Sequence, residues 1–204
     1  MRIMKNARSL IQVMLLSAIL MSAGGCLFSP RDPEVPTSGQ SIPYLARVSP
    51  ENVWENLQVS LNFSDTFGWE ENFHAEFTYL PDSEAESQFP GVFVGWNLEK
   101  ELNFIGNYYA SGVSNLSLMR NDEFNLPEPV GDEVRWEGVI YYIRVTDPSD
   151  GSETRYRASA IITFRLEGNF WYVYRWEDQI GESDPDSEQI LPTMGVLRGT
   201  FGSN

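Results

Sequence analysis

The sequence predicts an α+β domain in which a strongly bent antiparallel sheet is covered on one face by about three helices, a cone-like arrangement. Three observations support this prediction. The stretch from Val134 to Asp178 contains three strand-like runs joined by two turn signals. Two earlier stretches, which begin at Ser49 and Asn97, place apolar residues at helical spacing. The chain has 204 residues, of which 42% are apolar, and this is enough for one domain with a full core.

Residues 1–25 are predicted to be a signal peptide. Arg2, Lys5 and Arg8 make the start of the chain basic, and the stretch 10–21 that follows is almost wholly apolar. A basic start before a short apolar run is typical of a secretory signal. The run is too short to cross a bilayer as a permanent helix.

Small residues precede Cys26, the one cysteine of the chain. The stretch Ala23-Gly24-Gly25-Cys26 resembles the lipobox of bacterial lipoproteins, although Ala23 stands where that motif usually has leucine. The resemblance implies lipidation of Cys26, which becomes the first mature residue. It implies an exported, membrane-anchored lipoprotein of the cell envelope, at the outer membrane or periplasmic face if the host is Gram-negative. Ordinary cleavage of the signal is the alternative, and a single cysteine excludes a disulfide within the chain.

Residues 26–48 are predicted to be a lipid-anchored flexible tether that precedes a domain over 49–201. The tether contains four prolines and shows no repeating apolar face. The leader carries three of the 14 basic residues and no acidic one, so the rest of the chain has a formal charge of −18. Such a chain repels phosphates, which argues against a nucleic acid partner. We therefore expect contact with the membrane through the acylated cysteine.

The domain is expected to begin with helices. Ser49 offers a capping hydroxyl, Pro50 suits the first helical position, and Glu51 is favourable in the first turn. Apolar residues at helical spacing extend this helix over roughly fourteen residues. Asp65 is expected to cap a second, short helix, and Asn97 a third.

Two strands are predicted before the central stretch. Residues 74–80 alternate with period two and are expected to form a strand that ends at Pro81. Residues 83–88 are small and acidic, which favours a loop. The stretch 116–124 is a weaker strand candidate, because polar residues interrupt it.

The central stretch is predicted to form three antiparallel strands. Between the first two, Asp147-Pro148-Ser149-Asp150-Gly151 predicts a turn, because proline fixes φ and glycine supplies a positive φ. Between the second and third, Gly168-Asn169 is a hairpin signal. After Asp178, residues 190–201 are expected to add a short closing helix or strand.

This order of elements resembles the nuclear transport factor 2-like superfamily, the cystatin-like α+β cone that includes SnoaL-type polyketide cyclases and ketosteroid isomerase. The resemblance covers residues 50–180 approximately. It is carried by three stretches, SPENV at 49–53, NLEKE at 97–101 and GNFWYVYRWED at 168–178. It implies the fold. The superfamily has no single activity, and none of its catalytic residues aligns with this chain, so no catalytic role is carried over.

The simplest register across the two turns predicts which side chains share a face. Tyr142 then faces Tyr156, and Gly138 faces Ala160. The face that holds them is richest in apolar residues and is expected to be the concave core face. A one-residue bulge near Gly138 or Gly168 would reverse these faces.

The candidate pocket lies on this concave face. The register turns Arg175 and Glu177 into it, where they form either the polar end of an aromatic pocket or a structural ion pair. The candidate pocket residues are Trp136, Tyr142, Tyr156, Arg175, Glu177, His74, Tyr79 and Trp96. The opposite, convex face keeps enough large apolar side chains to predict association, including a homodimer through the sheet face. The side chains that give this second expectation are Val139, Tyr141, Ile143 and Val145.

The sequence favours binding over catalysis. His74 is the only histidine, which excludes catalytic dyads and metal sites that need two. No nucleophile motif, phosphate loop or metal-spaced cluster is present, and no catalytic residue, metal or cofactor is expected. The first hypothesis is a non-enzymatic domain that binds a small apolar ligand or a protein partner. The alternative is a SnoaL-like isomerase, cyclase or hydrolase that uses the concave pocket.

Overall fold

The computed structural model of the chain describes residues 42–112, 114–120, 125–147 and 149–202. The predicted signal peptide, Cys26 and most of the predicted tether lie outside these residues. The described part belongs to one compact unit that begins at Ile42. Its elements, in order, are α2 (Pro50–Phe63), α3 (Thr66–Glu70), β1 (Phe73–Leu80), α4 (Ser83–Gln88), α5 (Leu98–Ala110), β2 (Ser114–Arg120), β3 (Glu133–Thr146), β4 (Glu153–Glu167), β5 (Phe170–Gly181) and α6 (Met194–Gly202).

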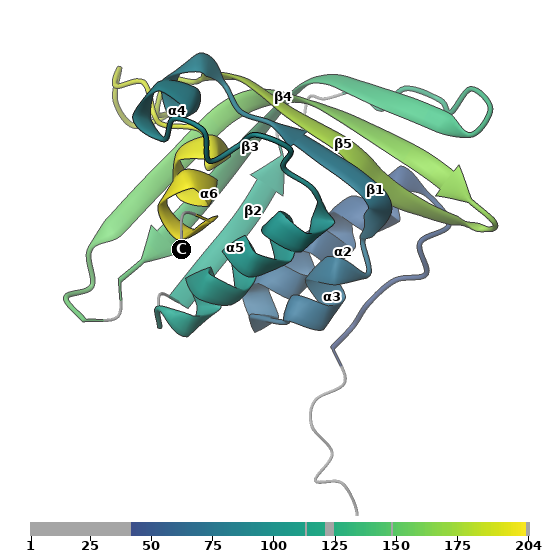
Figure 1. Ribbon diagram of the computed structural model, residues 1–204, viewed down its shortest axis with the longest axis horizontal. Coiled ribbons are helices and arrows are strands. Elements are labelled where there is room, and N and C mark those ends of the chain that lie inside the picture. Colours follow the sequence, from purple (N-terminus) through teal and green to yellow (C-terminus); the bar gives the residue numbers. More distant parts are fainter. Residues whose placement is uncertain (1–41, 113, 121–124, 148, 203–204) are drawn as a thin grey trace, which may run out of the picture. The chain divides into compact units, whose positions relative to one another are not determined.

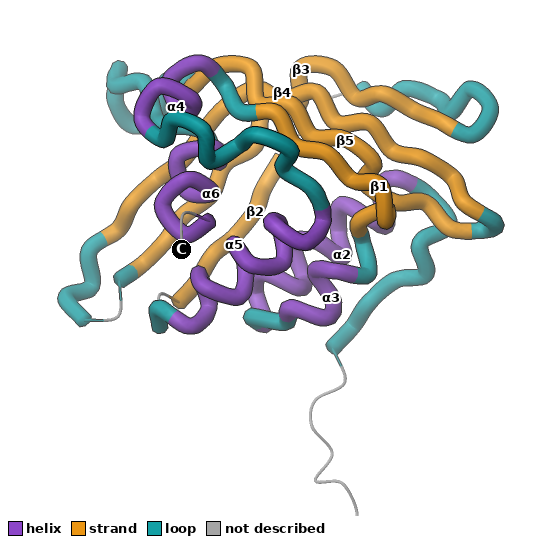
Figure 2. Tube along the Cα trace, viewed as in Figure 1, coloured by secondary structure: helices purple, strands orange, loops and turns teal. Residues whose placement is uncertain are grey.

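The unit has the predicted α+β architecture. Five strands form one sheet in the order β1-β5-β4-β3-β2. Strands β2 to β5 pair antiparallel, as predicted, whereas β1 pairs parallel to β5. The sheet curves over α2, α3, α5 and α6, which lie together on its concave side, and α4 lies at one end (Figures 1 and 2). No helix in this described part of the chain is long and apolar enough to cross a membrane.

The helix starts follow the capping residues. Ser49 Oγ accepts from the backbone N–H of Asn52, and Asp65 and Asn97 cap α3 and α5 in the same way, which confirms the three predicted starts. The loop predicted over 83–88 is wrong. Asp82 Oδ1 accepts from two backbone N–H groups, at 2.7 and 3.1 Å, and so starts α4 directly after β1.

A bulge at Gly138 overturns the predicted register. Trp136 pairs with Ile162, but the next pair is Val139 with Ala160, and Gly138 takes a φ of +70° at the extra position. The predicted pairs of Tyr142 with Tyr156 and of Gly138 with Ala160 are therefore wrong.

The bulge exchanges the faces of the second half of β3, which follows Gly138. Tyr142 now lies on the convex side, half-buried. The four side chains expected to be exposed there, Val139, Tyr141, Ile143 and Val145, are instead buried in the core. The apolar excess that suggested a homodimer through the sheet face is thus absent from this strand.

A second irregularity, in β5, turns the predicted polar pair outward. Thr163 pairs with Arg175, whereas Phe164 pairs with Val173, so one residue of β5 is extra. Arg175 and Glu177 consequently form an ion pair at 2.9 Å on the convex side, where the Arg175 side chain is 43% exposed. Their predicted place in the concave face is wrong. The residue that β5 brings inward is Asp178, which is buried.

The core is aromatic at its centre. Trp54 of α2 stacks on Trp176 of β5 with ring centroids 5.9 Å apart and lies 6.3 Å from Trp136 of β3. All three are almost completely buried. Burial of each such ring stabilises the fold by roughly 1.5–3 kcal/mol, so these rings help to hold α2 against the sheet.

The packed part of the chain begins before Ser49. The side chain of Asn56 in α2 bonds both backbone groups of Leu45, at 2.7 and 2.8 Å. Tyr44 Oη donates to Asp65 Oδ2 at 2.8 Å, and the carbonyl of Arg47 accepts from Trp171 N at 2.7 Å. Residues 44–47 are thus fixed to α2, α3 and β5.

Candidate functional site

The structure separates the predicted pocket residues into two groups. Trp136, Tyr156, Tyr79 and Trp96 are buried on the concave side. Tyr142, Arg175, Glu177 and His74 are not brought to it. The first four belong to the packed core, so the predicted set does not form one pocket.

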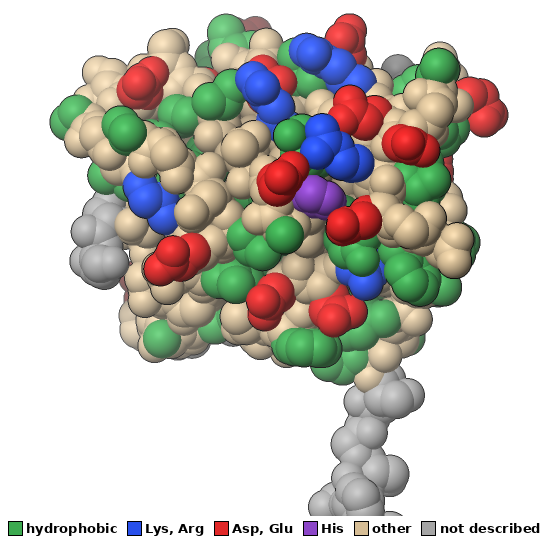
Figure 3. All heavy atoms as spheres, turned by 45° about the vertical axis from the view of Figure 1, so that its right-hand side comes forward, with side chains coloured by type: hydrophobic (Ala, Val, Ile, Leu, Met, Phe, Trp, Pro, Cys, Tyr) green, Lys and Arg blue, Asp and Glu red, His purple; other side chains and the backbone are tan. Residues whose placement is uncertain are grey.

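His74 lies on the convex side, at the start of β1. Its ring meets those of Tyr172 and Tyr174 edge-on, with centroids 6.0 and 5.4 Å away. Nδ1 accepts from the backbone N–H of Glu76 at 3.0 Å, and Nε2 lies 3.5 Å from Glu167 Oε2. Figure 3 shows this single histidine surrounded by acidic and basic side chains. Glu76 thus contacts it through the backbone and not as the carboxylate partner that a general base would need.

The polar centre of the concave face is Asp178, which accepts four hydrogen bonds. Oδ1 accepts from Tyr141 Oη and from Trp176 Nε1, each at 2.9 Å. Oδ2 accepts from Tyr79 Oη at 2.6 Å and from the backbone N–H of Gly195 at 3.0 Å. A carboxylate has about four lone-pair sites, so this group is fully satisfied. We call these five residues the Asp178 cluster.

The cluster joins the sheet to the last helix. Tyr79 comes from β1, Tyr141 from β3 and Asp178 from β5, while Gly195 lies in the first turn of α6. Tyr141 Oη also accepts from the backbone N–H of Met194 at 2.6 Å. The unpaired N–H groups of a helix start favour a negative group. The start of α6 therefore lies directly against the acid and the two phenols.

Burial sets the ionisation of the cluster. It raises the pKa of Asp178, against the opposing effects of the nearby Arg198 guanidinium and of the hydrogen bonds. Burial, and then the charge of Asp178, raise the pKa of Tyr79 and the pKa of Tyr141 well above their ordinary range. Both phenols consequently keep their protons at neutral pH and act as donors. An acid with two phenols can stabilise or move a proton on a bound molecule, but here the partners are the chain's own atoms.

A buried ion pair lies beside this cluster. Arg198 of α6 and Glu101 of α5 are both fully buried, and their fork-like contact includes Nη2 to Oε1 at 2.8 Å and Nε to Oε2 at 2.9 Å. Trp96 Nε1 donates to the same carboxylate at 2.8 Å. The guanidinium also lies over the ring of Tyr79, 4.1 Å from its centroid. The ion pair thus fixes α6 to α5 and to β1.

The sequence pattern did not point to Asp178, Tyr141 or Arg198 as site residues. Glu177 was assigned to the concave side because alternation was carried unbroken through β5, and a shift of one residue places Asp178 there instead. Arg198 lies in a stretch for which only a short helix or strand was expected. Its signal was a lone arginine between apolar residues near the end of an acidic chain, a pattern that favours a buried partner acid.

Metal chemistry has no support in the described ranges. Within them, no three histidine, cysteine, aspartate or glutamate side chains are grouped so that they could hold a metal ion. The acids nearest the concave face are already bonded to phenols, indoles or arginine.

Comparisons with known proteins address the fold. No family model matches the sequence, and no curated protein matches it. A conserved protein from Planctomyces limnophilus is similar in structure, with a TM-score of 0.52 and 15% identity over 63% of this chain and 91% of the other. A candidate aromatic ring hydroxylase from Novosphingobium aromaticivorans has a TM-score of 0.50 and 12% identity over 66% and 87%.

A third similar structure is named as a nuclear transport factor 2-like superfamily protein from Salmonella enterica. It has a TM-score of 0.48 and 11% identity, over 62% of this chain and 84% of that one. At these identities structural likeness speaks for the fold and not for the reaction. The structures with TM-scores of 0.52 and 0.50 are thus similar to this chain in fold. The chain itself has an α+β cone-like fold, with one bent sheet and helices on its concave side.

Proposed function

We propose that this chain is an exported lipoprotein of the cell envelope whose nuclear transport factor 2-like domain binds a partner and does not catalyse a reaction. The anchor is the acylated Cys26, which holds the domain at the membrane. The partner is a protein or a small apolar ligand, and the charge of −18 beyond the leader argues against nucleic acid.

One observation carries the non-catalytic part of this proposal. The backbone N–H of Gly195 donates to Asp178 at 3.0 Å, so the first turn of α6 lies directly against this acid. Two phenols and an indole supply the other three bonds. With the acid saturated and α6 against it, the concave face serves as core, and recognition is left to the outer surface.

Hydrogen exchange tests this assignment. We expect the amide protons of Met194 and Gly195 to exchange only through global unfolding, with protection equal to that of core amides such as Val173. Exchange of the two α6 amides that is much faster than that of Val173 would mean that α6 leaves the cluster within the folded protein. That result would contradict the closed-core assignment.

A second candidate function rests on the same residues. Asp178 with a raised pKa, beside two protonated tyrosines, is a constellation suited to a SnoaL-like isomerase, cyclase or hydrolase. It requires α6 to move away so that a substrate reaches Asp178. A fluorescent phenol such as 2-naphthol distinguishes the two. Saturable binding that is lost in Tyr141→Phe favours the enzyme, and no binding favours the closed domain.

Lipid labelling tests the anchor. In cells supplied with a labelled fatty acid, the wild-type chain should incorporate the label and fractionate with membranes, whereas Cys26→Ala should do neither. Ser29→Ala is a matched control close to the same site and should behave as wild type. Membrane fractionation of Cys26→Ala equal to wild type would contradict an acyl anchor.

A further inference from the structure

A groove lies between three segments that are far apart in the sequence, and none of its lining residues belongs to the Asp178 cluster. It is lined by residues 48–51 at the start of α2, by residues 126–129 before β3 and by Trp171 of β5. Its volume is about 350 Å³, within the range of about 300–1,000 Å³ that is usual for small-molecule sites. The groove therefore has room for a ligand outside the closed core.

The walls of this groove are largely apolar. Val48 is 61% exposed and Leu126 is 37% exposed, while Trp171, which is almost buried, completes the apolar surface. Three of the other lining residues are prolines, which have no backbone N–H to donate. Exposed apolar side chains that gather in one groove indicate a ligand with an apolar body.

The charged side chains of the groove are both acidic. Glu51 and Glu128 line it, and neither carboxylate has an ion pair or a hydrogen bond within the described residues. The hydroxyl of Ser49 already accepts from the backbone N–H of Asn52 at 3.3 Å as the cap of α2. No lysine, arginine or histidine of the described part lines the groove. Two carboxylates without a cation thus border an apolar surface.

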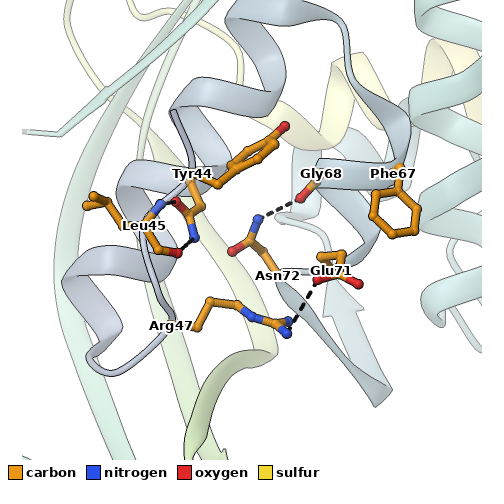
Figure 4. Close-up of a pocket in the computed structure, with 8 residues that line it drawn as sticks. Tyr44, Leu45, Arg47, Phe67, Gly68, Glu71 and Asn72 are labelled. Atoms are coloured by element: carbon orange, nitrogen blue, oxygen red, sulfur yellow. Dashed lines mark hydrogen bonds and ion pairs between the residues drawn. The ribbon is translucent and has the colours of Figure 1, made fainter. Parts of the chain in front are cut away.

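The basic residue closest to the groove in the sequence is directed elsewhere. Arg47 precedes Val48, but its Nη2 lies 3.5 Å from Glu71 Oε2, and its guanidinium lies over the ring of Tyr172, 4.4 Å from the centroid. Figure 4 shows Arg47 turned toward Glu71. A cation for the two carboxylates of the groove must therefore come from another source.

Charge limits what that source is. Residues 27–41 contain one base, Arg31, but Asp32 and Glu34 follow it closely, so this segment does not complement the groove. A second copy of the chain carries the same strong negative charge, which opposes its approach. Within the described ranges, no third acid joins the two carboxylates to hold a metal ion. An organic cation with an apolar chain matches both the charge and the walls.

We propose that this groove binds an aliphatic amine, that is, a primary ammonium on an apolar chain. The ammonium donates to the carboxylates of Glu51 and Glu128, and the chain packs on Val48, Leu126 and Trp171. Such charge-assisted hydrogen bonds are stronger than neutral ones. The negative charge of the domain attracts the cation from a distance. This inference names a ligand class for the proposed binding function, and it rests on that function only in assigning recognition to the outer surface.

Titration calorimetry on the full chain in detergent micelles tests the proposal, with the heat from micelles alone subtracted. Hexylamine is the probe, methylamine keeps the ammonium without the chain, and hexanol keeps the chain without the charge. Hexylamine should bind saturably, and each of the other two should bind at least about tenfold more weakly. Equal affinity for all three, or no saturable heat from hexylamine up to about 10 mM, would overturn the proposal. Hydrogen exchange at Met194 and Gly195 tests the closed core separately, so failure of one is distinguishable from failure of the other.

The double variant Glu51→Gln with Glu128→Gln removes both carboxylates. It should weaken hexylamine at least about tenfold and leave any affinity for hexanol unchanged. Glu55→Gln with Glu188→Gln is the matched control, since it removes the same charge from exposed residues that do not line the groove. Equal loss in both double variants, or in neither, would refute the proposed contacts. Glu128→Gln alone, outside every helix and strand, should also weaken hexylamine and replaces the double variant if that one does not fold.

Leu126→Ser tests the apolar wall. It should weaken hexylamine at least about threefold and leave methylamine unchanged, because only the chain packs on this side chain. Val94→Ser is the control, since Val94 is 76% exposed and does not line the groove, and it should bind hexylamine as wild type does. Hexylamine affinity that is the same in Leu126→Ser and Val94→Ser would contradict the proposed packing.

Discussion

Replacing Arg198 by methionine should destabilise the domain more than any surface charge change. The substitution leaves Glu101 fully buried and without its cation. Breaking a buried pair on one side costs about 3–5 kcal/mol, because the remaining charge is uncompensated. Loss of the guanidinium over Tyr79 adds about 0.5–2 kcal/mol. A domain has about 5–15 kcal/mol in total, so this one change approaches the limit of folding.

The double variant Glu101→Gln with Arg198→Met separates charge from packing. It leaves no buried charge, and the glutamine oxygen still accepts from Trp96 Nε1, which now donates to Glu101 at 2.8 Å. Its cost should therefore stay within about 2 kcal/mol of wild type. Since each single change leaves one charge unpaired, the two single costs should greatly exceed the cost of the double variant.

Urea unfolding followed by tryptophan fluorescence measures these free energies, provided that the slope with urea is the same for all variants. Arg135→Met is the control. Its ion pair with Glu137 has side chains that are 51% and 69% exposed, and its loss should cost at most about 1 kcal/mol. A cost for Arg198→Met below about 1 kcal/mol, or a double variant whose cost equals the sum of the single costs, would refute the reasoning.

Three further predictions follow from burial and backbone geometry. Because burial raises the pKa of Asp178 above 3.8, this acid contributes most stability below pH 3.8 and loses that contribution as pH rises through the native pKa. As the pH rises from about 4 to about 7, the unfolding free energy of Asp178→Asn should therefore increase relative to that of wild type. A difference between the two proteins that does not change with pH would contradict this. Gly138→Ala should destabilise the domain by about 1–2 kcal/mol because alanine is strained at a φ of +70°. Gly106→Ala, within α5 and with open space around it, should stabilise the domain by about 0.5–1 kcal/mol. Urea unfolding that finds Gly138→Ala as stable as Gly106→Ala would contradict this backbone strain. Asn56→Ala should lose about 1–3 kcal/mol with its two bonds to the N-terminal segment. Proteolysis within residues 42–47 should be faster in Asn56→Ala than in Asn62→Ala. Equal rates would mean that the Asn56 side chain does not hold this segment.

The secondary structure was predictable where it depends on residues close together in the sequence. The starts at Ser49, Asp65 and Asn97 were predictable because a capping side chain bonds a backbone N–H only two or three residues away. The strand predicted over 74–80, which the structure gives as Phe73–Leu80, and the antiparallel central strands followed from period-two alternation and turn residues. Asp82 was the exception, since it caps α4 only two residues after the end of β1, in a stretch whose small and acidic residues favoured a loop.

The candidate site was less predictable because it depends on register. Gly138 was recognised as a place for a bulge, but sequence alone does not say whether the extra residue is inserted, and one insertion exchanges both faces of a strand. No glycine or proline marks the register shift between Val173 and Arg175 in β5. The sequence therefore predicted Glu177 on the concave side, where the structure has Asp178. Contacts from α6, such as that of Gly195 to Asp178, join residues 17 positions apart through packing that no local pattern encodes.

The contacts that hold residues 44–47 to the domain determine where the proposed tether ends. With the acyl anchor that we propose at Cys26, fifteen residues lie between the lipidated residue and Ile42, where the packed unit begins. Covalent geometry limits that length of chain to about 55 Å when fully extended. The proposed anchor therefore predicts that a partner is met within about 55 Å of the lipid. Because Tyr44, Leu45 and Arg47 are bonded to the domain, these residues move with it and add no length to the proposed tether.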